Sequence, residues 1–261
     1  MADETTKEDE LAGTEQPFVQ HLVELRDRLL RAVYGIAAVA GVLVFYPGPA
    51  RLYELLAMPL VKALPEGSKM IAVGVVSPFL VPIKVSVLAA VGLSLPWILY
   101  QAWAFIAPGL YKHERKLVLP LVAASTLLFY LGAAFCYFFV FGQAFPAIQK
   151  MAPASVSVTP DIEAYLDFVI TMFIAFGVAF EVPIAVVILA RMGLVTVAQL
   201  RSWRSYFWVG AAAVAGLVTP PDPVSMVALL IPMGLLYEIG IWAAQVFIKH
   251  TTAAQDAAPT S

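Results

Sequence analysis

Six long apolar runs occupy most of this chain, and most of them are long enough to cross a lipid bilayer. A transmembrane helix needs about 20 consecutive, mostly apolar residues. Hydrophobic residues make up 61% of the 261 residues and charged residues only 13%, against about 45–50% and 25% in an average soluble domain. The sequence therefore predicts an all-α, polytopic membrane protein with six spans, at residues 29–46, 79–100, 117–141, 162–190, 205–218 and 224–247.

The last two spans are expected to be short. At 1.5 Å per residue, the fifth covers only about 20 Å of a hydrocarbon core that is about 30 Å thick. Either this final hairpin does not fully span, or the bilayer thins around it. We favour thinning, because the charges of the loops keep a consistent pattern only if both segments cross.

Positive charges mark one side of the membrane. By the positive-inside rule, the cation-rich loops predict that both termini are cytoplasmic. The polar ends, residues 1–16 and 249–261, are expected to be disordered tails around a membrane domain at residues 17–248. The cations of this side are Arg26, Arg28, Arg31, Lys112, Arg115, Lys116, Arg191, Arg201, Arg204 and Lys249.

Prolines inside the spans predict bent helices. Proline lacks a backbone N–H and clashes with the carbonyl four residues earlier, and helices kinked in this way can enclose a concave surface. The residues concerned are Pro82, Pro96, Pro120, Pro183 and Pro232.

The loop after the first span contains an amphipathic pattern. Leu52, Leu55, Leu56 and Leu60 fall on one helical face, which predicts a helix lying along the outer interface. The stretch GQAFPAIQKMAP, beginning at Gly142, predicts a second and shorter helix of this kind.

Charged residues also occur within the apolar segments. Glu181 lies near the middle of the fourth span, where a carboxylate costs about 2.5–3.5 kcal/mol to insert. It is either a polar spot that docks a partner helix or opens a wet cavity, or a protonated carboxyl bonded inside the bundle. Lys84 lies near an outer end, from which its stem can reach the interface. Asp222, in an outer turn, could simply cap the last helix.

Enzymatic sites are disfavoured. His21, His113 and His250 all map to the cytoplasmic side, so a serine–histidine pair within the bilayer is not available. The lone Cys136 can form neither an internal disulfide nor a thiolate metal cluster, and a small buried residue is expected. No HExxH motif or glycine-rich phosphate loop occurs. We expect no catalytic residue, cofactor, metal or nucleic-acid partner.

Two carboxylates stand among the cytoplasmic cations. Glu24 precedes the first span, and Glu114 lies in LYKHERK between the second and third. Each has a plain alternative. Glu24–Arg28 and Asp27–Arg31 have the spacing of i,i+4 helix ion pairs, and Glu114 could merely neutralise a neighbouring cation.

Five stretches, in order, resemble the TatC family over residues 17–248: HLVELRDRLL, SPF followed by PIK, PWILYQAWAFIAPGLYKHERK, FGVAFEVP and LVTPPD. That family is the polytopic subunit of the twin-arginine protein translocase. The resemblance implies a receptor in the bacterial cytoplasmic (inner) membrane that binds the twin-arginine signal peptides of folded precursors at the cytoplasmic face. It also implies assembly with single-span TatA/TatB-like subunits and with further copies, for export driven by the proton-motive force.

The resemblance also implies roles for particular residues. Glu24 and Glu114 match the signal-binding carboxylates, and Leu25 and Arg26 belong to the same N-terminal motif. Glu181 matches an intramembrane glutamate that faces a concave surface, and Met226 stands at a partner-contact position where some relatives carry glutamine. The outer-loop positions important to the family match Pro59, Phe79 and Asp222.

Separated carboxylates suit adjacent arginines, because a guanidinium donates two parallel hydrogen bonds that a lysine ammonium cannot match. Exposed ion pairs contribute about 0–1 kcal/mol each. The apolar part of a signal, at about 0.8 kcal/mol per buried CH₂, is expected to supply most of the affinity and the carboxylates the discrimination.

The rival function is a secondary transporter or channel that uses Glu181 and Lys84 as a polar pathway. The lack of an internal sequence repeat and of paired glycine-rich interruptions disfavours it.

Overall fold

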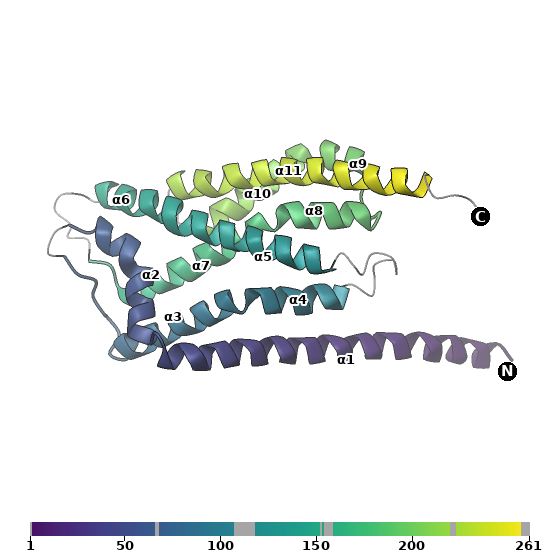
Figure 1. Cartoon of the computed structure of the whole chain (residues 1–261), viewed down its shortest axis with the longest axis horizontal. Helices are drawn as coiled ribbons and strands as arrows, with labels where there is room; N and C mark the ends of the chain where they lie inside the picture. Colours follow the sequence, from purple (N-terminus) through teal and green to yellow (C-terminus); the bar gives the residue numbers. More distant parts are fainter. Residues whose placement is uncertain are drawn as a thin grey trace.

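The computed structural model describes residues 2–65, 68–106, 118–151, 153, 159–219 and 223–256, and most of these are helical (Figure 1). Within this part of the chain, the only extended pairing is an isolated parallel bridge between Ile71 and Asp161. The predicted all-α fold is therefore confirmed for the described residues. The elements are α1 (Ala2–Phe45), α2 (Pro49–Ala63), α3 (Ser77–Leu93), α4 (Leu95–Ile106), α5 (Val118–Phe135), the π-helical turn η3 (Cys136–Val140), α6 (Phe141–Met151), α7 (Ile162–Phe180), α8 (Val182–Arg191), α9 (Val197–Ser202), α10 (Arg204–Val218) and α11 (Pro223–Asp256).

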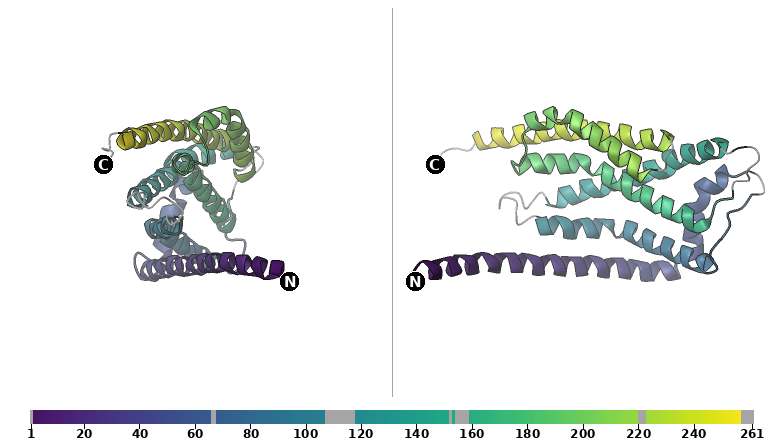
Figure 2. Two further views of the ribbon diagram at one scale, coloured as in Figure 1. Left: turned by 90° about the vertical axis from the view of Figure 1, so that its right-hand side faces the viewer. Right: turned by 180° about the vertical axis from the view of Figure 1, so that it is seen from behind.

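Most helices run along the long axis of the molecule, and α2 lies across one end (Figure 1). The start of α1 and the end of α11 both lie at the end of the molecule away from α2. They lie at two opposite edges of the bundle there (Figure 2). Helix α1 already begins before residue 17 and α11 continues past residue 248. The predicted domain boundaries and disordered ends remain predictions.

The membrane-spanning segments can be compared with those predicted. The bent pair α3–α4 makes a fifth candidate span if its two helices cross as one, and α10, with 15 residues, reaches only about 22 Å. The expectation that both final spans are short is wrong for α11, whose 24-residue apolar segment reaches about 36 Å. The four helices that are long and apolar enough on their own are Val19–Phe45, Leu119–Lys150, Ile162–Arg191 and Pro223–Val246.

Prolines accompany two helix breaks within the predicted spans, one of them a sharp bend. Helices α3 and α4 meet at 53° around Ser94, next to Pro96. Helices α7 and α8 are separated at Glu181, next to Pro183. In both places the proline cannot donate to the carbonyl four residues earlier, so the helical ladder is interrupted. By contrast, Pro82 and Pro232 lie inside continuous helices.

A tyrosine hydroxyl donates a hydrogen bond to the backbone at the bend between α3 and α4. Pro96 has no N–H for the carbonyl of Gly92, and the hydroxyl of Tyr130 on α5 donates to that oxygen at 2.8 Å. A side chain thus supplies the hydrogen bond that the proline removes, as the satisfaction of backbone groups requires in a bilayer.

Helix α2 confirms the predicted amphipathic helix. Ala57 and Leu60 are buried beneath it, while Pro59 leaves the Leu55 carbonyl without its helical donor. The hydroxyl of Tyr137 on η3 donates to that carbonyl at 2.6 Å. The continuous helix α5–η3–α6 therefore ties down both α2 and the bent pair α3–α4.

The second predicted interfacial helix is not a separate element. Residues 141–151 form α6, which continues directly from η3, because the backbone N–H of Phe141 bonds back to the Cys136 carbonyl through the π-helical turn. The third span is correspondingly longer than predicted and extends to Lys150.

The main core lies between α5–α6, α7 and the α10–α11 hairpin, with Phe141, Phe176 and Cys136 completely buried. The expected burial of Cys136 is confirmed. Two glycines let α5 and α7 approach closely. A Cβ at Gly177 would lie 2.3 Å from the ring of Phe129, and one at Gly132 would lie 2.7 Å from the Phe176 carbonyl oxygen.

Candidate functional site

One face of α1 packs against α3 and α4. Its buried and half-buried positions recur every three or four residues, as expected for one face of a helix. Towards the N-terminal end of α1 this face becomes polar. The stripe includes Glu24, Arg28, Ala32, Gly35, Val39 and Leu43.

Glu24 and Arg28 form an ion pair on this stripe, as their spacing predicts. Nη2 and Nε of Arg28 donate to the same carboxylate oxygen, Oε1, at 2.7 and 2.9 Å. The side chains are 35% and 21% exposed. Among the described residues, none donates to Oε2, so half of the acceptor remains open towards a shallow polar depression of about 360 Å³.

The residues next to Glu24 point elsewhere. Leu25 is 44% exposed, and Arg26 donates through Nε and Nη2 to Asp27 at 3.0 and 2.7 Å. The predicted Asp27–Arg31 pair is wrong for the described residues, in which the Asp27 carboxylate accepts from its neighbour Arg26 instead.

Aromatic residues of α4 fix the polar end of α1. The rings of His21 and Phe105 stack with their centroids 4.3 Å apart and an interplanar angle of 18°. Further along, the indole N–H of Trp97 donates to the Arg31 carbonyl at 2.9 Å. The ring of Trp97 leaves no room for a Cβ at Gly35, which would lie 2.5 Å away.

Glu114 lies outside the described residues, as does the rest of LYKHERK. The described chain leaves α4 at Ile106, one residue after the ring that stacks on His21, and resumes at Val118. Asp222 also falls outside the described ranges.

An apolar groove of about 490 Å³ lies between α2, α3, α5 and α7. It extends from the α2 end of the bundle to the bend between α3 and α4. Its lining includes Leu52, Leu56, Leu88, Gly92, Tyr130 and Phe173.

Glu181 occupies the break between α7 and α8 and is half-buried. Its carboxyl lies beside Ser125, whose hydroxyl accepts from the indole N–H of Trp103 at 3.3 Å. The oxygen Oε1 is buried and has no partner among the described residues. The carboxyl thus lies next to side chains of α5 and α4, with one oxygen left for a further donor.

The other candidate residues are dispersed. Met226 is half-buried against the main core and lies 3.8 Å from where a Cβ of Gly216 would stand, so it packs α11 on α10. Pro59 lacks the N–H that would bond the Leu55 carbonyl of α2, and the Tyr137 hydroxyl donates to that carbonyl instead. Phe79, in the first turn of α3, is 68% exposed.

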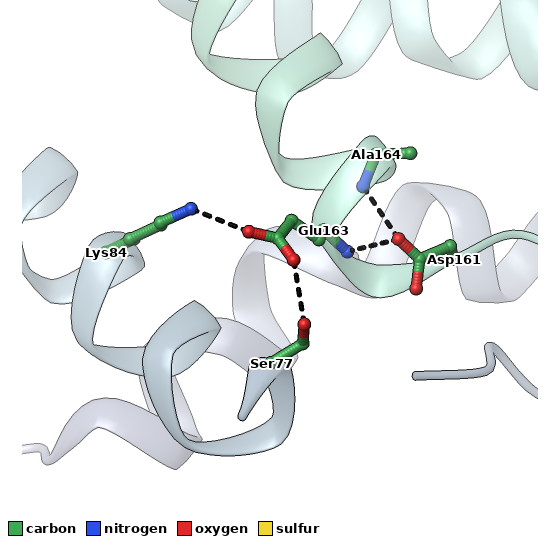
Figure 3. Close-up of polar contacts among 5 residues, drawn as sticks. All are labelled: Ser77, Lys84, Asp161, Glu163 and Ala164. Atoms are coloured by element: carbon green, nitrogen blue, oxygen red, sulfur yellow. Dashed lines mark hydrogen bonds and ion pairs between the residues drawn. The ribbon is translucent and has the colours of Figure 1, made fainter. Parts of the chain in front are cut away.

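Lys84 does not share a site with Glu181. Its ammonium lies 2.9 Å from the Glu163 carboxylate (Figure 3), whose other oxygen accepts from the Ser77 hydroxyl at 2.7 Å. Glu163 and Glu181 are 18 residues apart along α7, about 27 Å at 1.5 Å per residue. A polar pathway that uses Lys84 and Glu181 together therefore finds no support in the geometry.

Asp161 caps the start of α7 beside this pair (Figure 3). The N–H groups of Val73, Ala164 and Glu163 donate to its carboxylate at 3.0, 3.1 and 3.2 Å. These hydrogen bonds, led by that of Val73, hold the pKa of Asp161 below its usual value. The bond from Val73 joins residues 68–76 to α7, next to the Ile71–Asp161 bridge.

The His21–Phe105 stack is the feature that sequence reasoning missed. The spacing of His21 and Glu24 places both on one helical face, but nothing in the sequence indicates which ring would meet His21. In the described part of the chain, no group of three or more His, Cys, Asp or Glu residues is arranged to hold a metal.

Comparison with known proteins places this arrangement in a family. A family model described as Sec-independent protein translocase protein (TatC) matches residues 20–232. This chain belongs to the TatC family. It is 49% identical over 233 residues to the Sec-independent protein translocase protein TatC of Escherichia coli, which covers 89% of this chain and 90% of that relative. It is 35% identical over 243 residues to the protein of the same name from Aquifex aeolicus, which covers 92% and 100%.

A crystal structure described as the twin arginine translocase receptor TatC has the same fold, with a TM-score of 0.73 and 36% identity over 87% of this chain and 98% of that one. The resemblance drawn from the sequence is confirmed. The chain is a multi-pass membrane protein of the TatC family and a component of twin-arginine protein translocation.

Proposed function

We propose that this TatC-family protein is the receptor subunit that binds twin-arginine signal peptides, with Glu24 and Glu114 as the arginine acceptors and Leu25 and Arg26 beside them. The observation that carries the proposal is the Glu24 carboxylate, which is half-buried on the α4-facing side of α1 and keeps Oε2 open. The chain leaves α4 beside this turn, and Glu114 follows eight residues after Ile106.

Two carboxylates from different segments match the chemistry of two adjacent arginines. Each guanidinium can donate two hydrogen bonds to a carboxylate, whereas an ammonium acts as a point charge. This difference supplies discrimination between arginine and lysine signals. The receptor acts by binding, without catalysing the breakage of a bond.

The apolar part of the signal supplies most of the affinity in this proposal. We assign it to the apolar groove between α2, α3, α5 and α7, whose lining includes Gly92. Gly92 lies 13 residues before Phe105, the residue of α4 next to the Glu24 turn of α1. That is about 20 Å, a distance that six or seven extended residues span. Burial of apolar carbon at about 0.8 kcal/mol per CH₂ exceeds the about 0–1 kcal/mol of an exposed ion pair.

We infer six spans, with α10 as the fifth, and both termini in the cytoplasm of a bacterial cell whose cytoplasmic (inner) membrane holds the protein. Two observations support this topology. The start of α1 and the end of α11 lie at the same end of the bundle (Figure 1). In addition, Arg191, Arg201 and Arg204 flank the connection from α8 to α10. The short α10 then implies a bilayer thinned around it.

The remaining candidate residues are assigned to assembly. Glu181, with Oε1 unpartnered, and Met226, on the α10–α11 hairpin, are proposed to contact single-span TatA/TatB-like subunits during export driven by the proton-motive force. Pro59, the exposed Phe79 and Asp222 are assigned to the outer side, where further copies of the chain associate.

The test is peptide binding to the purified full chain. Glu24→Gln and Glu114→Gln should each weaken an Arg-Arg signal peptide about five- to tenfold, equivalent to about 1–1.4 kcal/mol, with a much smaller effect on the Lys-Lys peptide. Glu54→Gln, on α2 at the other end of the bundle, is the matched control. Equal losses for both peptides would show that the two carboxylates act only through their negative charge and do not distinguish arginine from lysine. Photocrosslinkers placed singly at positions 24 and 114 should capture residues next to the arginine pair.

A further inference from the structure

His21 lies one helical turn before Glu24, and its ring stacks on Phe105 at the end of α4. We propose that His21 is a positioning residue for the Glu24 carboxylate, acting by holding the first polar turn of α1 against α4. The inference rests on the proposed recognition of arginine by Glu24 and adds a residue to it.

The helix geometry places the two groups together. His21, Glu24 and Arg28 are spaced by three and four residues, so their side chains share one face of α1. Phe105 meets that face with a centroid separation of 4.3 Å and nearly parallel rings. An aromatic pair of this geometry contributes stabilisation beyond the area that it buries, which is enough to bias the position of an exposed helix end.

The apolar residues of this part of α1 add little to its packing. Val19, Leu22, Val23 and Leu25 are all between 44% and 56% exposed. The next described polar or ring contact between α1 and α4 is the hydrogen bond from Trp97 to the Arg31 carbonyl. It lies ten residues further along α1, about 15 Å away. The stack therefore anchors the turn that carries Glu24.

The consequence for binding follows from preorganisation. When the stack is lost, the first described polar or ring contact between α1 and α4 is the one at Arg31, and the Glu24 carboxylate is presented correctly for a smaller fraction of the time. The apparent affinity of a ligand falls by that fraction. The loss applies only to ligands that use Glu24, so the effect of His21 should depend on the presence of that carboxylate.

The experiment is a double-mutant cycle on the full chain in detergent or nanodiscs, with a labelled Arg-Arg signal peptide as the probe. His21→Ala should weaken binding about two- to tenfold, the range that the energy of the ring stack permits. His21→Phe, which keeps a stacking ring, should stay within about twofold of the parent chain. In the Glu24→Gln background, His21→Ala should have an effect below about twofold.

Two controls separate positioning from general damage. Phe207→Ala removes another stacked ring, which lies 4.0 Å from Tyr237 on the α10–α11 side. It should lower thermal stability and show no coupling to Glu24→Gln. Equal losses from His21→Ala with and without Glu24, or failure of His21→Phe to restore binding, would overturn the inference.

The proposed function fails by a different result. If Glu24→Gln alone leaves the preference for Arg-Arg over Lys-Lys unchanged, arginine recognition at Glu24 is wrong. If that preference falls while His21→Ala acts independently, only the positioning role is lost.

Discussion

Tyr130 and Tyr137 each donate to a carbonyl that a proline has deprived of its helical N–H. They lie seven residues apart on the helix that runs through α5 and η3, and so share one face. One continuous helix therefore donates a hydrogen bond both to the bend between α3 and α4 and to α2. At the level of single residues, the fold depends on side chains that complete a broken backbone ladder.

Tyr137→Phe should lower the free energy of unfolding by about 1 kcal/mol, because the Leu55 carbonyl loses the hydroxyl that replaces its missing helical donor. In a Pro59→Ala background the new N–H can serve that carbonyl, so the same change should cost clearly less. Thermal unfolding in detergent measures both, with Tyr206→Phe at an exposed site as the control. Equal costs in the two backgrounds would mean that the hydroxyl does not replace the missing proline N–H.

Arg28 competes with any incoming cation for Glu24. Arg28→Gln should strengthen binding of an Arg-Arg peptide about two- to fivefold and that of a Lys-Lys peptide much less, because only the arginine signal depends on Glu24. An ion pair of this exposure contributes about 0.2–1 kcal/mol, and an internal competitor lowers the apparent affinity of a ligand that needs the same group. Peptide titration measures the factor, and Arg31→Gln, in the same depression, controls for the lost charge. A weaker affinity for the Arg-Arg peptide would show that Arg28 does more than compete.

At the scale of the elements, several hydrogen bonds join residues 68–76 to the start of α7. Asp161 caps α7 and binds Val73 with the same carboxylate, while Glu163 joins Ser77 and Lys84 of α3. These hydrogen bonds link α3, the loop before it and α7, at the end of the molecule that α2 crosses (Figure 1).

The lowered pKa of Asp161 gives this junction a defined dependence on pH. A carboxyl with a pKa below its unfolded value stabilises the fold above the unfolded pKa, near 3.8. That contribution is lost as the pH falls through the folded pKa. Asp161→Asn should therefore lower the melting temperature at pH 6, and the difference from the parent chain should shrink as the pH falls from 5 to 3. Asp167→Asn, on the exposed side of α7, should show no such convergence.

For the whole molecule, the decisive question is how many times the chain crosses the bilayer. The described helices include four long apolar spans, a bent pair and the short α10. The start of α1 and the end of α11 lie at the same end of the bundle (Figures 1 and 2), so the number of crossings is even. The four long spans and the bent pair make five, so α10 must also cross despite its length.

Cysteine labelling tests that topology, since Cys136 is completely buried and should not react. In intact cells, a membrane-impermeant maleimide should label Ser68→Cys, and it should label Thr5→Cys and Thr252→Cys only after the membrane is broken. Reaction of positions 5 and 252 from opposite sides would contradict six crossings and would remove α10 from the set of spans.

By itself, the sequence determined the helical class, the approximate positions of the apolar segments, the Glu24–Arg28 pair and the family. These properties depend on local composition, on helical spacing and on motifs that are continuous along the chain. Only the tertiary structure decided that Lys84 pairs with Glu163, that Tyr137 serves Leu55, 82 residues earlier, and that Phe105 meets His21. Those contacts join residues far apart in the chain, and a helical pattern specifies which face is buried without specifying which side chain it will meet.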